Sequence, residues 1–537
     1  MKRLFFLCFL ANLLLGDVGR VGADEHELHE ENAKNVPTEQ VNFKEGGECW
    51  LDETCNLIND TLPNIIILLA DDLGYGDLSF SGHPTSRTPQ LDQLARESRF
   101  FTHFYVTSPV CSPSRASLLT GRVQVRSGVY PRVFISDSTL GLPRNETTIA
   151  TLLKKKGYRT QIVGKWHLGV GAAREYLPMH FGFDQYLGLP YSQDMCPCRQ
   201  CFPQGQPCYD LCWPSKVSCP LFSNSSIVEQ PAYLPTLTQR LVAQAKVFIS
   251  DAAASQQPFF LYFPFLHVSY LVDVRLESCS VFDGGHSHGN TGVIRKDMEL
   301  WLTSLSPGKT SGLASTLDIL PTLASLVHLD TSNLTLDGVD LSPLLRDPLA
   351  KSPRKMYAVY PQSPEQSLGP FAVTNGTYKA HFYTIGSDLS DPDNYDPLCP
   401  SSHPLTHHDP PLLYNLYYDP GERYNLANDS LYLPVLDMLG EWREEHMKTM
   451  TWMEPRTTTT DPLAQPCCNQ PSCQPFPECC DCPVITHPNH INSYHHDKST
   501  AILEEAAEST AILEEAAEST TILEEVDTAI LEEAADA

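Results

Sequence analysis

The sequence predicts an α/β fold, with a large, mostly parallel sheet flanked by helices and a small C-terminal antiparallel sheet. Residues 65–69 and 258–265 are continuous apolar runs, which is typical of strands that are buried on both faces of a parallel sheet. Segments with helical patterns alternate with these runs along the chain. After about residue 336, strand-like segments joined by turn residues replace that alternation.

Residues 1–23 have the pattern of a secretory signal peptide. Lys2 and Arg3 precede an apolar run from Leu4 to Leu15, and small residues at 21–23 suit cleavage. The run is too short to span a bilayer comfortably, and no later segment offers about 18 unbroken apolar residues. We therefore expect a protein of the secretory pathway without a membrane span.

The expected catalytic domain covers residues 61–335 and follows a polar, acidic N-terminal extension at 24–60. Its elements, in chain order, are a strand at 65–69, a helix at 88–98 with Thr88 at the N-cap, a helix at 147–156, and strands at 160–163 and 258–265. Asp71, Asp72, Lys165 and His167 all follow strands. Ligand sites in parallel sheets lie outside the carboxyl ends of the strands, so these residues are site candidates.

A C-terminal subdomain is expected at 336–485. Its strands are predicted in KMYAVYP, FAVTNGTYKAHFYT and LLYNLYYDPGERYNL, with a helix after them and a cysteine-rich tail. Residues 486–537 form a linker and an acidic repeat of STAILEEAAE with a period of ten. Ten residues are not close to a whole number of helical turns, so we expect no steady coiled-coil seam in this segment.

Composition narrows the function. The net charge of −28 argues against nucleic acid as a partner. Eighteen cysteines and six N-x-S/T sequons fit an exported glycoprotein with disulfide bonds. Leaving out Cys8 in the signal peptide, and Cys111, sixteen cysteines remain, an even number that suits pairing.

Cys111 opens the segment CSPSRASLLTGR, residues 111–122, which resembles the signature of the sulfatase family, Cys-x-Pro-Ser-Arg followed by Leu-Thr-Gly-Arg. The resemblance also takes in residues 64–78, GKWHLG at 164–169 and the cysteine-rich segments. It implies the alkaline-phosphatase-like sulfatase fold and an arylsulfatase that cleaves sulfate esters. It also implies that Cys111 is oxidised to formylglycine, by the enzyme that generates this group during biosynthesis.

The resemblance assigns roles residue by residue. It makes Cys111, Arg115, Lys165 and His167 catalytic, and Asp71, Asp72 and the group at position 111 ligands of calcium or, alternatively, magnesium. Ser192, in the segment Pro-Tyr-Ser, and His267 would contact the substrate. The hydrate of formylglycine has two hydroxyls, of which one takes over the sulfate and the other releases it.

The same resemblance implies a sulfated small molecule or glycolipid as substrate and the lysosome, or else secretion, as the destination. The sequence leaves the oligomeric state open, a homo-oligomer included.

The chain departs from the family between Tyr270 and Ser306. The family has a histidine just after the strand that corresponds to residues 258–265. The best ungapped alignment places Ser269 at that position, and His267 lies two residues earlier. The family also has a later Asp-Asn-Gly and a later lysine, and neither has a clear counterpart in this shorter segment. Asp283 is only weakly similar to the aspartate of the Asp-Asn-Gly. Neither Lys296 nor Lys309 can be assigned to the family's lysine.

Three hypotheses therefore stay open: a working arylsulfatase, a relative without catalysis that acts by binding, or an incomplete isoform. A phosphatase of the same superfamily is a remote fourth, because its nucleophile is usually threonine or serine.

Overall fold

The computed structural model confirms the predicted α/β class. The structure describes most of the two expected domains. The described residues are 4–7, 62–71, 73–74, 76–195, 216–266, 301–303, 307–347, 349–385, 405–469, 472–474, 476, 479–480 and 482. The predicted extension at 24–60, the acidic repeat, and the departure between residues 270 and 300 lie outside these residues. No helix in the described part of the chain is both long enough and apolar enough to cross a membrane.

The large sheet has ten strands, and its centre is parallel. The strand order is β11-β3-β10-β1-β2-β9-β5-β6-β7-β8. The four central strands that run parallel are β2 (Asn64–Leu69), β9 (Phe259–Pro264), β5 (Arg159–Val163) and β6 (Gln185–Gly188). These include the predicted strands, with bounds shifted by one residue or so.

Both margins of the sheet contain antiparallel pairs, so the sheet as a whole is mixed. One margin consists of β7 (Leu221–Ser223) and β8 (Ser226–Glu229). On the other, β10 (Trp301–Thr303) pairs antiparallel with β3 (Arg99–Phe101), and β3 pairs parallel with β11 (Gly308–Thr310).

A strand from the predicted signal peptide lies inside this sheet. Leu4–Leu7 forms β1, which pairs parallel with β2 and antiparallel with β10. Removal of residues 1–23 would take this strand out of the sheet and leave β2 without its neighbour on that side. Cleavage after residue 23 stays a prediction.

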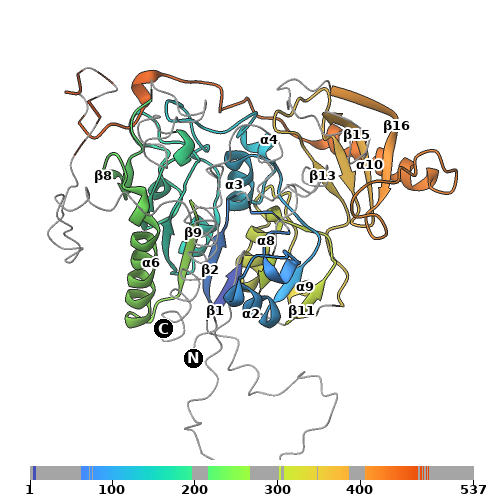
Figure 1. The fold of residues 1–537 in the computed structure, drawn as a ribbon, viewed down its shortest axis with the longest axis horizontal. Coiled ribbons are helices and arrows are strands. Elements are labelled where there is room, and N and C mark those ends of the chain that lie inside the picture. Colours follow the sequence, from blue (N-terminus) through green and yellow to red (C-terminus); the bar gives the residue numbers. More distant parts are fainter. Residues whose placement is uncertain are drawn as a thin grey trace, which may run out of the picture.

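Helices cover both faces of the sheet, as Figure 1 shows. Ile65, Ile67 and Leu69 of β2 pack on the face that carries α3 (Cys111–Thr120), α5 (Ile149–Lys154) and α8 (Ile319–Leu326). Ile66 and Leu68 pack on the opposite face, which carries α2 (Pro89–Glu97) and α6 (Leu237–Ala254). This alternation explains why β2 is apolar at every position. Helices α2 and α5 match the predictions at 88–98 and 147–156, although the Thr88 side chain makes no cap hydrogen bond.

The remaining short elements connect these layers. They are β4 (Phe104–Tyr105), β12 (Ala314–Ser315), α4 (Gln124–Ser127), α9 (Ser342–Arg346), and the 3₁₀ helices η1 (Ser79–Ser81), η2 (Pro178–His180), η3 (Gln193–Met195), η5 (Leu234–Thr236), η8 (Thr316–Asp318) and η9 (Pro462–Ala464).

The C-terminal subdomain is a four-stranded antiparallel sheet with a helix packed on it, as predicted. Its strands, in order, are β13 (Tyr357–Val359), β14 (Ala372–Thr374), β15 (Tyr378–Ile385) and β16 (Leu405–Asn415). Helix α10 (Leu433–Thr449) contacts β14 and β15. This sheet stands beside the large one in Figure 1.

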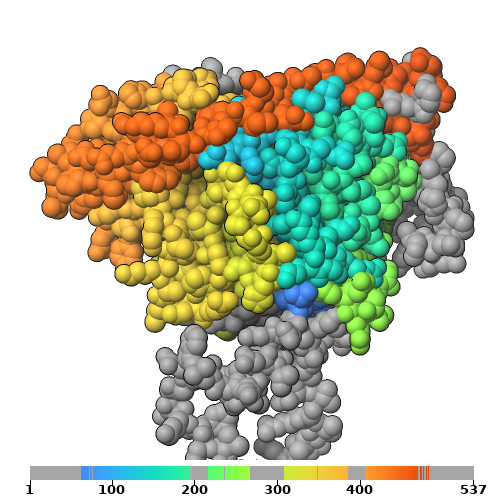
Figure 2. Space-filling view, turned by 180° about the vertical axis from the view of Figure 1, so that it is seen from behind, coloured from blue at the N-terminus to red at the C-terminus, as the bar shows by residue number. Residues whose placement is uncertain are grey.

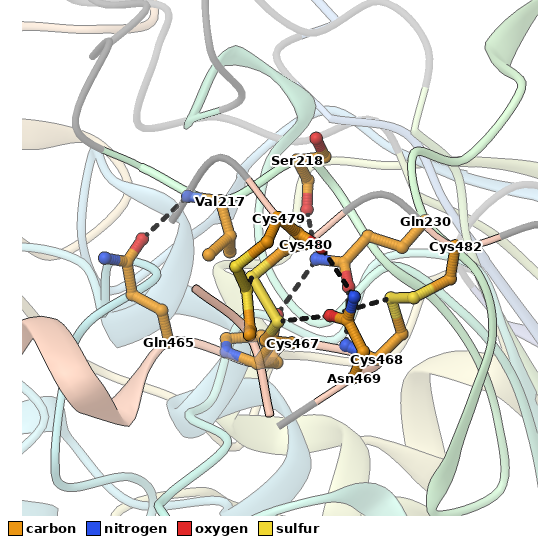
Figure 3. Close-up of a disulfide and its surroundings, with 12 residues drawn as sticks. Val217, Ser218, Gln230, Gln465, Cys467, Cys468, Asn469, Cys479, Cys480 and Cys482 are labelled. Atoms are coloured by element: carbon orange, nitrogen blue, oxygen red, sulfur yellow. Dashed lines mark hydrogen bonds between the residues drawn. A yellow bond between two sulfur atoms is a disulfide. The ribbon is translucent and has the colours of Figure 1, made fainter. Parts of the chain in front are cut away.

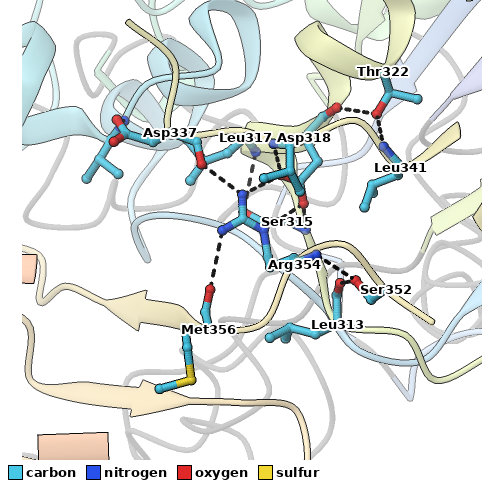
Figure 4. Close-up of polar contacts among 12 residues, drawn as sticks. Leu313, Ser315, Leu317, Asp318, Thr322, Asp337, Leu341, Ser352, Arg354 and Met356 are labelled. Atoms are coloured by element: carbon cyan, nitrogen blue, oxygen red, sulfur yellow. Dashed lines mark hydrogen bonds and ion pairs between the residues drawn. The ribbon is translucent and has the colours of Figure 1, made fainter. Parts of the chain in front are cut away.

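A buried ion pair joins the two parts of the chain (Figure 4). Arg354 donates to both carboxylate oxygens of Asp318, which is fully buried, and Arg354 Nη2 also donates to the carbonyl of Asp337 at 2.9 Å. The Asp337 amide in turn donates to the carbonyl of Gly121, at the end of α3, at 2.9 Å. The helix that begins at Cys111 is therefore tied to the start of the second domain.

After α10 the chain returns across the large domain. The orange-red C-terminal segment crosses the top of the molecule, over residues coloured cyan, in Figure 2. Its backbone bonds to that domain at several points, among them Arg456 to Gly128 at 2.9 Å and Asp461 to Asp137 at 2.8 Å. It ends in the predicted disulfide-rich tail, which contains the bonds Cys467–Cys480, Cys468–Cys482 and Cys473–Cys479 (Figure 3).

Candidate active site

Four of the predicted site residues meet at the carboxyl ends of the central strands. Asp71 follows β2, Lys165 follows β5, and Cys111 and Arg115 lie on the first turns of α3. The Asp71 carboxylate contacts both cations: its Oδ1 accepts from Arg115 Nη2 at 3.1 Å, and its Oδ2 accepts from Lys165 Nζ. Arg115 Nη1 also donates to the Lys165 carbonyl at 2.8 Å. The strand ends and the helix start thus converge on one buried cluster.

The Cys111 thiol lies at the edge of this cluster and is in no disulfide within the described part of the chain. Its Sγ is 3.4 Å from Lys165 Nζ and 3.6 Å from Asp71 Oδ1. The thiol is half-buried, whereas Arg115 and Lys165 are almost completely buried. A reactive group at position 111 would therefore have the Lys165 cation within reach and one partly open side.

The electrostatics of the cluster are dominated by burial and by the ion pairs. Burial would raise the pKa of Asp71, but Lys165 and Arg115 outweigh it and hold that pKa far below its ordinary value. Burial opposes the charge of Arg115 too, yet Asp71 raises its pKa above the ordinary value. Among the described residues of the cluster, one carboxylate and two cations leave a net positive charge, which suits an anionic substrate group.

The tautomer of His167 follows from its hydrogen-bond partner. Burial, then Lys165 and Arg115, lower its pKa well below the ordinary value. Its Nε2 lies 2.9 Å from the carbonyl oxygen of Phe134, and a carbonyl can only accept, so the proton is on Nε2. Its Nδ1 is then an acceptor; it is buried and has no hydrogen-bond partner among the described residues.

The loop after β5 is held by backbone bonds on both sides. The Lys165 amide donates to Pro264 at 2.9 Å, and the His167 amide donates to Pro190 at 3.0 Å. His167 itself has a φ of 62°, in the left-handed region. Gly164 has a φ of 124°, and a Cβ there would lie 1.9 Å from the Pro264 oxygen, so no other residue fits.

Ser192 follows β6 and is buried, close in sequence to the Pro190 carbonyl that binds the loop. Two predicted site residues, Asp72 and His267, lie outside the described residues, as do Ser269, Asp283 and Lys296. Lys309 lies in β11, four strands away from β2 at the margin of the sheet, and is not part of the cluster.

The prediction from sequence missed the Phe134 carbonyl that orients His167. A backbone oxygen belongs to no sequence motif, and Phe134 lies 33 positions before His167. Only the fold could reveal this contact.

The described residues fit a divalent cation in type but not in number. A hard cation takes about six or more oxygen ligands, and Asp71 supplies the only carboxylate in the described part of the cluster. Among described residues, only the group Cys467, Cys473 and Cys480 places three candidate metal ligands together, and these cysteines are in disulfides.

The formylglycine that the family implies fits better, because Lys165 Nζ lies 3.4 Å from Cys111 Sγ and the buried Nδ1 of His167 has no hydrogen-bond partner among the described residues.

Two family models match the chain. The Sulfatase model matches residues 63–269, and the model for the C-terminal region of aryl-sulfatase matches residues 352–481. The first match ends at the point where the sequence departs from the family. The first matched region contains strands β2 to β9, and the second contains strands β13 to β16 and helix α10.

Individual relatives agree. Arylsulfatase A from Bos taurus is 42% identical over 487 residues, covering 78% of this chain and 95% of the relative. Arylsulfatase A from Homo sapiens is 41% identical over 486 residues, with the same coverage. N-acetylgalactosamine-6-sulfatase from Canis lupus familiaris is 30% identical over 489 residues, covering 74% of this chain and 88% of the relative.

Solved structures share the fold. The PsFucS1 sulfatase from Pseudoalteromonas sp. has a TM-score of 0.58 at 20% identity, covering 76% of this chain and 94% of its own. The structure of Ps i-CgsB in complex with k-i-k-neocarrahexaose has a TM-score of 0.53 at 21% identity, covering 73% and 94%.

Proposed function

The chain belongs to the sulfatase family, and we propose that it hydrolyses sulfate esters at Cys111 after conversion of that residue to formylglycine. The observation that carries this proposal is the buried cluster at the strand ends. Lys165 Nζ and Asp71 Oδ1 lie 3.4 and 3.6 Å from Cys111 Sγ, and Arg115 is held against the same carboxylate.

When present, the hydrate of formylglycine would supply a hydroxyl that takes over the sulfate while its proton leaves with the substrate's alcohol, and a second hydroxyl whose deprotonation expels the sulfate and restores the aldehyde for rehydration by water. Lys165 and Arg115 bind the sulfate oxygens through charge-assisted hydrogen bonds. His167 offers Nδ1 as a hydrogen-bond acceptor for a hydroxyl at position 111, because Phe134 keeps the other ring nitrogen protonated. Asp71 keeps both cations in place.

A divalent cation, calcium or alternatively magnesium, would be held by Asp71, Asp72 and the group at position 111. Such an ion stabilises negative charge on oxygen. Since the described residues offer too few oxygens, the steps above are assigned to side chains alone.

The substrate class we propose is a sulfated glycolipid or another sulfate ester of a small molecule, with Ser192 and His267 as substrate contacts. The relatives named arylsulfatase A support a sulfate ester as the substrate, whereas the glycolipid and the two contact residues follow from the family resemblance alone. We also propose the secretory pathway and the lysosome, or secretion, as its location. The formylglycine-generating enzyme would be a partner during biosynthesis, and the oligomeric state, a homo-oligomer included, is left open.

An alternative is a chain that binds sulfated ligands without turnover, or an incomplete isoform. It is supported by the end of the Sulfatase match at residue 269. The alignment with the bovine relative points the same way. It runs over 487 positions but takes in only 78% of 537 residues, so dozens of its positions face gaps in this chain.

The test uses the full chain secreted from cells that make formylglycine. We would measure the calcium-dependent release of a chromogenic phenol from an aryl sulfate at acidic pH, beside Cys111→Ala, and determine the fraction of aldehyde at position 111 by mass spectrometry. Turnover that is lost in Cys111→Ala supports the proposal. Folded protein that carries the aldehyde but has no turnover would favour the binding alternative.

A further inference from the structure

One residue connects the nucleophile helix to His167. The Phe134 amide donates to Ser112 Oγ, next to Cys111, at 3.1 Å, and the Phe134 carbonyl accepts from His167 Nε2 at 2.9 Å. Ser112, Phe134 and His167 are all almost completely buried. The position of loop 134–138 therefore sets both the tautomer of His167 and its placement relative to Cys111.

A buried ion pair anchors this loop. Asp137 Oδ2 accepts from Lys216 Nζ, and the two residues are only 7% and 8% exposed. Within the loop, Ile135 and Ser138 close a tight turn: the Ile135 amide donates to Ser138 Oγ at 2.8 Å, and the Ser138 amide donates to the Ile135 carbonyl at 3.0 Å. Because the turn is short and closed, the anchor at Asp137 also restrains Phe134.

The C-terminal segment adds a second restraint to the same loop. Gln465 Oε1 accepts from the amide of Val217 at 2.9 Å and from Ser136 Oγ at 3.4 Å, so it joins the loop to the residue after Lys216. Figure 3 shows the Gln465 side chain directed at Val217, beside the disulfides. The Asp461 amide also donates to the Asp137 carbonyl at 2.8 Å.

We propose that Asp137, through its pair with Lys216, is a positioning residue that keeps the Phe134 carbonyl on His167. The proposal rests on the proposed function for its catalytic consequence, but its geometric part concerns the folded chain alone. Removing one partner of a buried ion pair leaves the other charge uncompensated, so loop 134–138 must shift or take up water. His167 then loses the partner that fixes its tautomer.

Two variants test this, Lys216→Met and Asp137→Asn, with Lys216→Arg as the conservative rescue. Lys154→Met is the matched control, because it removes the same type of side chain from an exposed ion pair, Lys154–Asp184, on the same domain. Hydrogen exchange followed by mass spectrometry reads peptides from residues 132–139 and 164–169 in the full chain. Both should exchange about tenfold or more faster in the two variants.

The rescue variant and the control should exchange like the wild type in both peptides. Unchanged exchange at 164–169 in Lys216→Met would overturn the proposal, whether or not the chain turns over substrate. If Asp137→Asn is not secreted, Lys216→Met decides, since it leaves every side chain of the loop in place.

Kinetics separate positioning from simple loss of structure. In an active wild type, kcat should fall about tenfold in Lys216→Met with KM within about twofold, because the cations that bind sulfate are untouched. Equal kcat in Lys216→Met and Lys154→Met would overturn the proposal. A folded but inactive wild type would instead contradict the proposed function, and the exchange experiment would still decide the role of Asp137.

Discussion

Glu422→Gln tests how much one buried carboxylate contributes to the C-terminal sheet. Glu422 is 5% exposed and accepts from Lys379 Nζ at 3.1 Å and from His381 Nε2 at 2.5 Å. Burial would raise the pKa of Glu422, but Lys379 and His381 outweigh it and lower that pKa from 4.5 to about 2. A difference of about 2.5 in pKa corresponds to about 3 kcal/mol.

The sign of the pH dependence follows from the lowered pKa. The stabilisation is fully present above pH 4.5, the ordinary pKa, and is lost as the pH falls toward about 2. Glutamine has the same shape but no charge. The variant should therefore be about 3 kcal/mol less stable at pH 6, and the difference from wild type should shrink below pH 4.5.

Hydrogen exchange of the β15 peptide at residues 378–385 measures the opening of this sheet locally. At pH 6 the peptide should exchange roughly a hundredfold or more faster in Glu422→Gln than in wild type. Glu444→Gln, at an exposed pair 4.0 Å from Lys448, should not differ from wild type. Equal exchange at pH 6, or a difference that persists to pH 2, would refute the reasoning.

Three further predictions concern the site. Lys165→Met should lower kcat/KM for an aryl sulfate by about a hundredfold or more, because a charged contact to the reacting group is lost; a change below about threefold would contradict this role. Gly188→Ala should lower the melting temperature and the secreted yield, because a Cβ at position 188 would lie 1.8 Å from the carbonyl oxygen of Gly164, just after β5. The control Gly440→Ala should be tolerated, because open space surrounds Gly440. Asp71→Asn leaves the buried Lys165 and Arg115 without their carboxylate, so inorganic sulfate should raise the melting temperature of the variant more than that of wild type. Equal increases in the melting temperature of the two proteins would speak against this charge balance.

The parts of the site that follow from local patterns could be predicted from the sequence. Asp71 and Lys165 come directly after buried strands, and the strand pattern itself places them at one edge of a parallel sheet. Cys111 and Arg115 are one helical turn apart, so their common side of α3 was also predictable. Their mutual distances were not, because these depend on how strands far apart in sequence pair.

The contacts that restrain His167 were beyond sequence reasoning. Asp137 and Lys216 are 79 residues apart, and either could equally be a solvated surface charge. The Phe134 carbonyl could not be singled out either, because every residue has a backbone carbonyl. The run that begins at Leu4 illustrates a different limit, since the same apolar residues suit both a signal peptide and the buried strand β1.

The long return of the C-terminal segment has a consequence for the order of events during synthesis. Gln465 leaves the ribosome some 350 residues after Cys111, which at ordinary elongation rates is a delay of roughly 20 to 70 seconds. During that interval loop 134–138 lacks its bonds to residues 459–465, while Cys111 has already been made. A modifying enzyme that must reach the Cys111 side chain therefore has a window in time before the last restraint on the site can form.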